Sequence, residues 1–296
     1  MTKGYEGLRN GAAWLDLSAR ARFVVRGRDR ARYLHNVTSN EIKKMTPGSA
    51  CYAFLLTPQG RIQADADVFC FPEHFLLDTE PEMRGKLPPV VMKFKVADQV
   101  ELEDITEKTG SIGVEGPRAA DLRAAFANQP LFTVVDATVT GQPGFRVICA
   151  AEQFAQLISA AERVAAQATA DDARAVRIEN GKPRYGEDIR ETSLPQETQQ
   201  LQGVSFTKGC YVGQEIVERI RAQGHVNKLL VRLEAESSEP LAGGAKVTAE
   251  GKEAGEITSS IRSPQSGCVA ALAIVRTPFA QPGTRLQAGE VSLRVV

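Results

Sequence analysis

The feature that most constrains the fold is the C-terminal part of the chain, where no helical pattern occurs after residue 228. Short runs rich in strand-forming residues follow one another there, and glycine, proline and serine separate them. Such a series of short strands is typical of a small antiparallel barrel or sandwich. The runs cover residues 229–233, 246–249, 256–259, 268–275 and 291–296. The sequence therefore predicts an all-β C-terminal domain.

The preceding residues mix strand and helix patterns. Residues 52–57 are apolar, Pro58-Gln59-Gly60 supplies a turn, and residues 61–68 alternate between polar and apolar side chains. This pattern indicates a β-hairpin with one polar face. Residues 173–180 are predicted to be helical, with Gly181 as the C-terminal stop. No repeat of fixed period occurs, which excludes a solenoid.

Composition limits the classes of function. The chain of 296 residues carries 36 basic and 36 acidic side chains, so it has no broad electrostatic footprint for nucleic acid. No apolar run approaches the roughly 20 residues that span a bilayer, and the first residues lack the apolar core of a signal peptide. We therefore expect a cytoplasmic protein with no strong nucleic-acid footprint and no membrane partner. The five cysteines and three histidines lack zinc-ligand spacing, so we expect no metal site.

The motif KGCYVGQE, residues 208–215, places a single thiol between a cation and two glycines. Apolar residues at four-residue spacing follow it, which predicts an amphipathic helix that begins near Tyr211. A helix N-terminus and the neighbouring Lys208 would both lower the pKa of the Cys210 thiol, because each favours the thiolate. Cys210 is therefore a candidate nucleophile. The alternative is a buried, small apolar residue at a strand–helix junction.

Two carboxylate positions are further candidates. Glu179 ends an apolar segment just before the turn at Gly181, where a buried carboxylate can accept two N–H donors from a flat heterocycle. The alternative for Glu179 is a cap or an ion pair at a helix end. Asp65 and Asp67 share the polar face of the hairpin, about 7 Å apart. Their repulsion would raise one pKa, as acid–base chemistry requires, unless this face is simply solvated.

Together these segments resemble the YgfZ-type folate-binding proteins, relatives of the aminomethyltransferase (T-protein) of the glycine cleavage system. The motif KGCYVGQE matches the hallmark of the YgfZ branch in full. Three other stretches are similar to family segments and occur in the family's order: residues 32–40, 55–62 and 177–186, the last reading RIENGKPRYG. The resemblance runs over nearly the whole chain.

The resemblance implies a fold of three domains around a central opening that binds tetrahydrofolate. Two would be interleaved α+β units and the third an antiparallel β-barrel. The expected segments are residues 1–226 for the two units (approximately 1–48 with 84–172, and 49–83 with 173–226) and residues 227–296 for the barrel.

The resemblance also implies roles for individual residues. The family's pterin-binding glutamate falls on Glu179. Its hairpin acid falls on Asp65, although the T-protein pattern has two adjacent acids where this chain has Ala64-Asp65. The full set of expected site residues is Cys210, Lys208 and Asp65 as catalytic groups, and Glu179, Tyr185, Tyr211, Gln214 and Glu215 as folate-binding groups.

The function implied by the resemblance is support of the assembly or repair of iron–sulfur proteins, including tRNA-modifying enzymes, with folate as the ligand. Such proteins would be the clients, and Cys210 would exchange with a thiol or hold an adduct near the folate. A stably bound cluster is not expected, because one thiol cannot replace the usual four cysteines. A folate-dependent aminomethyltransferase with Asp65 as the key acid, and a non-catalytic folate-binding scaffold, are the alternatives.

Overall fold

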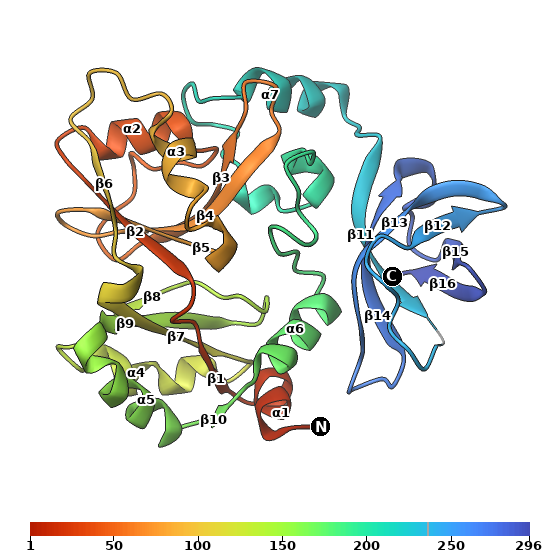
Figure 1. Cartoon of the computed structure of the whole chain (residues 1–296), viewed down its shortest axis with the longest axis horizontal. Coiled ribbons are helices and arrows are strands. Elements are labelled where there is room, and N and C mark those ends of the chain that lie inside the picture. Colours follow the sequence, from red (N-terminus) through yellow and green to blue (C-terminus); the bar gives the residue numbers. More distant parts are fainter. Residues whose placement is uncertain (236) are drawn as a thin grey trace.

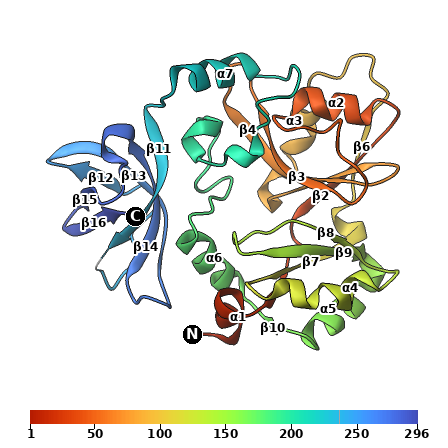
Figure 2. The same cartoon turned by 180° about the vertical axis from the view of Figure 1, so that it is seen from behind.

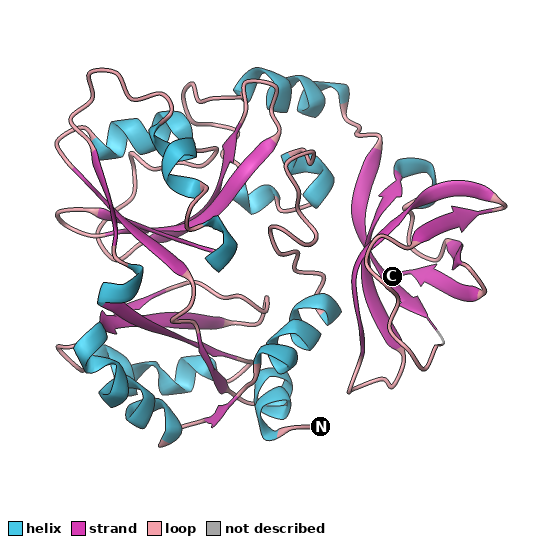
Figure 3. Cartoon of the chain, in the orientation of Figure 1, coloured by secondary structure: helices cyan, strands magenta, loops and turns pink. Residues whose placement is uncertain are grey.

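The computed structural model describes residues 1–235 and 237–296, and it contains two α+β units beside a C-terminal barrel (Figure 1). Each α+β unit is built on one five-stranded sheet. Figure 3 shows that helices gather on the outer faces of the two sheets, so that the sheets face each other across the centre of the molecule.

The first sheet has the order β10-β1-β7-β9-β8 and is antiparallel except for the parallel pair β1–β10. Helices α4 (Arg123–Ala127) and α5 (Phe154–Glu162) cover it, and a core around Trp14, Phe126 and Phe145 forms between them. The strands are β1 (Ala13–Asp16), β7 (Thr109–Glu115), β8 (Thr133–Val135), β9 (Gly144–Ala150) and β10 (Ala166–Gln167).

The second sheet has the order β3-β4-β5-β2-β6, and every pair in it is antiparallel. Helices α2 (Arg30–Val37) and α3 (Leu87–Met92) pack on it over the largest hydrophobic core among the described residues. The strands are β2 (Ala21–Arg26), β3 (Ala50–Leu56), β4 (Ile62–Cys70), β5 (Phe75–Thr79) and β6 (Glu101–Asp104). The predicted hairpin is confirmed as the pair β3–β4.

The strand pairing corrects the expected grouping of residues 1–48 with residues 84–172. Strands β2 and β6 both pair in the second sheet, beside the hairpin, and not with β1 and β7. The physical reason is that β2 is apolar along most of its length and its strand edges are satisfied by β5 and β6 on either side. Sequence order alone did not show this partner choice.

Helices α1 (Lys3–Asn10) and α6 (Ala170–Glu179) lie between the first sheet and the barrel (Figures 1 and 2). A capping box between Thr169 and Asp172 begins α6, and Gly181 follows its end with a φ of 71°, as the sequence predicted. Residues 195–203 then form two short 3-10 helices, Pro195–Thr198 and Leu201–Gly203.

Helix α7 (Gln214–Gln223) leads into the barrel. It begins at Gln214, so the expected start near Tyr211 is wrong. The reason is that Gly213 adopts a positive φ of 83° and ends the preceding loop there. A Cβ on Gly213 would lie 2.6 Å from the carbonyl oxygen of Thr57, which only glycine allows.

The predicted C-terminal β-barrel is confirmed: its six strands close in the order β11-β14-β13-β12-β15-β16. Their inward side chains form a separate core, and Ile178 of α6 packs against Leu230 and Leu272 on the outside of the barrel. The strands are β11 (Lys228–Ala235), β12 (Lys246–Ala249), β13 (Lys252–Arg262), β14 (Val269–Arg276), β15 (Arg285–Ala288) and β16 (Val291–Val295). Within the described part of the chain, no helix is both long and apolar enough to cross a membrane.

Candidate functional site

A cavity of about 1050 Å³ lies where the two sheets, α6 and the loop after α6 meet. Its lining includes residues 15–20 at the end of β1 and in the loop after it, residues 50–52 and 65–67 of the hairpin, residues 80–82, residues 136–139, and residues 167–187 in part. The volume is at the upper end of the roughly 300–1,000 Å³ of small-molecule sites. The cavity is therefore large enough for an extended organic ligand.

Asp65 is the predicted site residue that the structure places most clearly in this cavity. It is only 8% exposed, and its Oδ2 accepts a hydrogen bond of 2.5 Å from the hydroxyl of Tyr52. No cation lies within ion-pair distance of its carboxyl group among the described residues. Burial raises the pKa of Asp65 to about 7, although the Tyr52 bond acts in the opposite direction. At neutral pH the carboxyl group is therefore present both as donor and as acceptor.

The cause of this shift differs from the one expected. Asp67 also lines the cavity, but its repulsion contributes less to the raised pKa of Asp65 than burial does. Asp67 instead lies 3.5 Å from the guanidinium of the buried Arg146. On the polar face of the hairpin, Asp65 is thus buried and Asp67 is half-buried, and both line the cavity.

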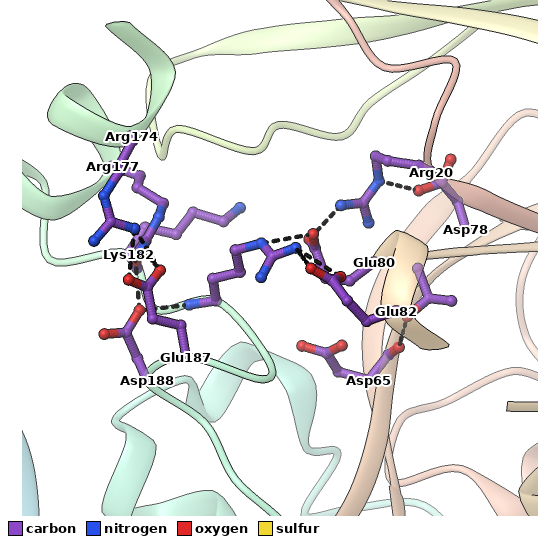
Figure 4. A network of polar contacts seen from close by, with 12 residues as sticks. Arg20, Asp65, Asp78, Glu80, Glu82, Arg174, Arg177, Lys182, Glu187 and Asp188 are labelled. Carbon is purple, nitrogen blue, oxygen red and sulfur yellow. Dashed lines mark hydrogen bonds and ion pairs between the residues drawn. The ribbon is translucent and has the colours of Figure 1, made fainter. Parts of the chain in front are cut away.

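Ion pairs tie the walls of the cavity together. Arg20, from the loop after β1, pairs with Asp78 and Glu80. Arg184, from the loop after α6, reaches Glu80 at 2.8 Å and Glu82 at 2.6 Å. Figure 4 shows Glu80, Glu82 and Asp65 on the side of the second sheet, opposite Arg177 and Lys182. These contacts hold two distant chain segments across one site.

The opposite wall is fixed to the barrel through Asp188. Its Oδ2 pairs with Arg177 at 2.7 Å, and its Oδ1 accepts hydrogen bonds of 2.6 Å from both Thr258 and Ser259. Lys182, in the same loop, donates to the carbonyl oxygen of Thr138 at 2.5 Å and lines the cavity. No carboxylate in the described residues pairs with Lys182, so its ammonium group remains for an anionic part of a ligand.

Tyr185, one of the expected folate-binding residues, lines the same cavity. Its hydroxyl donates to the carbonyl oxygen of Gln63 at 2.5 Å, and burial raises its pKa. Because the hydroxyl is already engaged, the ring face is what Tyr185 offers to a ligand.

Glu179, which was expected beside the pterin, does not line this cavity. Its carboxylate accepts hydrogen bonds from the hydroxyls of Tyr5 at 2.8 Å and Ser263 at 2.5 Å, and it lies 3.7 Å from Arg9. The physical reason is helix geometry. Arg177 faces the cavity, and a residue two positions later lies about 200° around the helix. Glu179 therefore joins α1, α6 and the barrel, as the ion-pair alternative described.

Lys208 also differs from its expected role beside the thiol. Its side chain turns into the protein, where its ammonium group donates to the carbonyl oxygens of Thr38 and Asn40 at 2.7 Å each, and also to that of His35. Burial lowers the pKa of Lys208 to about 7. The ammonium also lies 4.8 Å from the centre of the Tyr211 ring. Lys208 therefore joins the motif to the end of α2.

Cys210 is exposed, so the alternative of a buried apolar residue is wrong. It lies four residues before α7, and it does not line the cavity. The other residues of the motif do not line the cavity either. Tyr211 is buried, whereas the Glu215 side chain is 90% exposed and lies 3.6 Å from Arg219, and Gln214 begins the helix. The motif therefore lies apart from the cavity, whereas the thiol was expected to lie beside the folate in one shared site.

Several cavity residues were not predicted from the sequence, among them Tyr52, Lys182 and Arg184. The signal for Tyr52 was present in the hairpin, because alternation places it on the same polar face as Asp65 and Asp67. Lys182 and Arg184 flank a proline in a loop, where no periodicity indicates a direction. Within the described residues, no group of three or more histidine, cysteine, aspartate or glutamate side chains is suited to a metal ion.

Two family models match the chain. Residues 1–143 match the GCVT N-terminal domain, and residues 228–292 match the glycine cleavage T-protein C-terminal barrel domain. An aminomethyltransferase of Nostoc sp. is 27% identical, with 97% of this chain and 83% of the relative covered. An aminomethyltransferase of Geobacillus kaustophilus is 26% identical, with 96% and 84% covered.

A solved structure extends the comparison to the fold. The glycine cleavage system aminomethyltransferase T from Bartonella henselae superposes with a TM-score of 0.87 at 19% identity, over 99% of this chain and 87% of that chain. The two matched domains and the shared three-part arrangement lead to one conclusion: this chain belongs to the GcvT-like superfamily.

Proposed function

We propose that this chain binds tetrahydrofolate, or a derivative of it, in the cavity beside Asp65. The observation that carries the proposal is a buried carboxyl group with a pKa of about 7, which faces a cavity of about 1050 Å³ without a cationic partner among the described residues. The amino-pyrimidinone edge of a pteridine presents both donors and acceptors, and such a carboxyl group can match either. Membership of the GcvT-like superfamily supports a folate-type ligand.

The chemical character of two other cavity residues, an aromatic ring and a cation, also suits a folate. Tyr185 offers a ring face to a flat heterocycle. Lys182 supplies a cation without a carboxylate partner in the described chain, which suits the carboxylates of the glutamyl part. When bound, the folate would supply one-carbon chemistry. This chain would supply orientation, through Asp65, and a cavity whose walls are joined by the pairs of Arg184 with Glu80 and Glu82.

Calorimetry with tetrahydrofolate tests the proposal. Asp65→Asn keeps the size of the side chain but fixes one donor–acceptor arrangement, so we expect the affinity to fall at least about tenfold. Glu215→Gln is the matched control, since Glu215 is exposed and remote from the cavity lining. Equal affinity of the parent and Asp65→Asn would refute the assignment of Asp65, and no binding to the parent would refute the folate proposal itself.

We further propose that Cys210 acts outside the cavity, on a partner that approaches from solvent. Its thiol is exposed, and all five cysteines are free, as is usual for a protein of the reducing cytoplasm. The resemblance to YgfZ-type proteins supports iron–sulfur proteins as these partners, including those that modify tRNA. Lys208 would serve this role by positioning the loop, because it anchors the motif on three carbonyl oxygens of residues 35–40.

A complementation experiment tests the role of the thiol. In a strain that lacks the protein, the parent should restore the activities of iron–sulfur enzymes, whereas Cys210→Ala should not. Cys268→Ala is the control, because Cys268 is a half-buried thiol of the barrel. Full rescue by Cys210→Ala would contradict the proposal.

A folate-dependent aminomethyltransferase is the second candidate. The near-neutral carboxyl group of Asp65 favours it, as do relatives that carry that name. This function predicts turnover of an aminomethyl donor that Asp65→Asn abolishes and Cys210→Ala preserves. A non-catalytic scaffold predicts tetrahydrofolate binding by the parent with no such turnover.

A further inference from the structure

A second, smaller cavity of about 270 Å³ lies between the barrel and the segment that follows the loop after α6. Asp188, Arg190, Thr192 and Ser193 form one wall. The opposite wall consists of the start of β11, the start of β12, residues 253–256 of β13 and the end of β14. Nothing in the folate proposal uses this cavity.

The cavity is rich in cations. Arg190, Lys228, Lys246 and Arg276 line it, together with the carboxylates of Asp188, Glu253 and Glu256. The carboxylate of Asp188 already forms an ion pair with Arg177 and accepts hydrogen bonds from Thr258 and Ser259. Two carboxylates therefore remain for four cations, in a chain whose formal net charge is zero.

Two of the four cations, Lys228 and Arg276, have no close carboxylate partner among the described residues. Glu256 pairs with Arg190 at 2.6 Å and with Lys246 at 3.4 Å, and Glu253 pairs with Lys246 at 3.4 Å. Lys228 has only a distant partner, because Glu197 lies 4.0 Å away. In the parts of the chain that the structure describes, Arg276 makes no ion pair.

Lys228 and Arg276 lie directly opposite each other on the antiparallel strands β11 and β14. Like charges in this position repel, and the pair costs stability by itself. Both side chains point to the same face of the barrel, since directly paired residues share a face. An anion bound between them would remove the repulsion and accept charge-assisted hydrogen bonds from both.

Ser193 adds a neutral donor to the same cavity. Its side chain is buried, and its Oγ accepts from the backbone N–H of Arg190 at 3.1 Å, which leaves the hydroxyl hydrogen to be donated. We propose that this cavity between the barrel and residues 188–193 is a binding site for a small oxyanion, a phosphate or carboxylate group, held by Lys228, Arg276 and Ser193.

Titration with inorganic phosphate and, in a separate arm, with glutarate tests the site on the full chain. The ionic strength is held constant with chloride, and amide chemical shifts in NMR report the binding. We expect saturable shifts for at least one anion, centred on residues 190–193 and 253–256 and not on residues 136–139 of the large cavity. The arm that saturates at the lower concentration identifies the preferred group.

Two variants decide whether the named cations bind the anion. Arg276→Gln and Lys228→Gln should each weaken binding about tenfold, because each removes a charge-assisted contact. Arg285→Gln is the matched control on β15, outside the lining, and should bind like the parent. Absence of saturable shifts in both arms, or parent-like binding by both Arg276→Gln and Lys228→Gln, would overturn the proposal. Neither result bears on tetrahydrofolate binding, so the two proposals fail separately.

Discussion

The large cavity and the cysteine motif place their ionisable groups in opposite ways. In the cavity, the carboxyl group of Asp65 faces an open space, and the ion pairs around it form walls. In the motif, the ammonium group of Lys208 turns inward onto carbonyl oxygens, while the thiol of Cys210 faces solvent. The first arrangement suits a small ligand, and the second suits a partner that arrives from outside.

The difference teaches that neighbours in a sequence need not act together. Lys208 and Cys210 are two residues apart. Lys208 stabilises the loop through its buried hydrogen bonds, whereas Cys210 is exposed to solvent. Tyr52 and Asp65 are on different strands, yet a hydrogen bond of 2.5 Å joins them in one site.

The largest effect is expected at the buried lysine. Lys208→Met leaves three carbonyl oxygens without their donor, and each buried polar group that loses its partner costs about 1–3 kcal/mol. Urea unfolding should therefore show a much lower free energy of unfolding. Lys44→Met is the control, because the Lys44 side chain is 81% exposed. A loss below about 1 kcal/mol, the range of exposed charges, would contradict the internal role of Lys208.

The pH dependence of stability tests the environment of Asp65. Burial raises the pKa of Asp65 to about 7, so the folded state holds this proton more tightly than the unfolded state. The contribution of Asp65 to the free energy of unfolding should therefore fall as the pH rises from about 4 to about 7, by up to about 1.4 kcal/mol per pH unit.

The comparison of the parent with Asp65→Asn isolates this contribution, since asparagine does not titrate. The difference between their free energies of unfolding should shift in favour of Asp65→Asn as the pH rises through this range. Asp136→Asn, whose side chain is 75% exposed, should follow the parent. Parallel curves for the parent and Asp65→Asn would show that the carboxyl group has an ordinary pKa.

A smaller effect is expected from the hydroxyl that holds Asp65. The Tyr52 bond stabilises the carboxylate, so Tyr52→Phe should raise the pKa of Asp65 further, by roughly one unit. Carbon-13 NMR of the carboxyl group measures this directly. Tyr33→Phe is the control, because the Tyr33 hydroxyl donates to Val91 far from Asp65 in the hydrogen-bond network. An unchanged or lowered pKa in Tyr52→Phe would show that the bond does not act on Asp65.

The smallest effect concerns the glutamate first assigned to the pterin. Glu179→Gln should change the affinity for tetrahydrofolate less than about twofold, because its carboxylate contacts Tyr5 and Ser263 outside the cavity. The same variant should lose about 1–3 kcal/mol of stability, since it weakens a buried network. A loss of affinity comparable to that of Asp65→Asn would show that Glu179 contacts the bound folate. It would contradict the position of Glu179 outside the cavity.

Much of the fold could be predicted because it depends on local patterns. The barrel followed from strands separated by turn residues, and the hairpin β3–β4 followed from strict alternation. The same alternation placed Asp65 on a polar face. The pairing of β2 and β6 with this hairpin could not be predicted, because partner choice depends on contacts between distant segments.

The site was predicted less completely than the fold. The resemblance indicated Asp65 and Tyr185, which line the cavity, but it also indicated Glu179, which α6 directs towards α1 and the barrel. The sequence showed that a lysine lies near the thiol, but the direction of a side chain in a loop follows from its tertiary partners. For Lys208 these are carbonyl oxygens some 170 residues earlier in the chain.

The most direct test of the account is the position of tetrahydrofolate in a crystal structure of its complex with this protein. We expect the pteridine ring within hydrogen-bond distance of the Asp65 carboxyl group, between the two sheets, with the sulfur of Cys210 exposed and out of contact with the ligand. A pteridine ring bound against the Cys210 loop or at Glu179, with the space beside Asp65 filled by water, would contradict it.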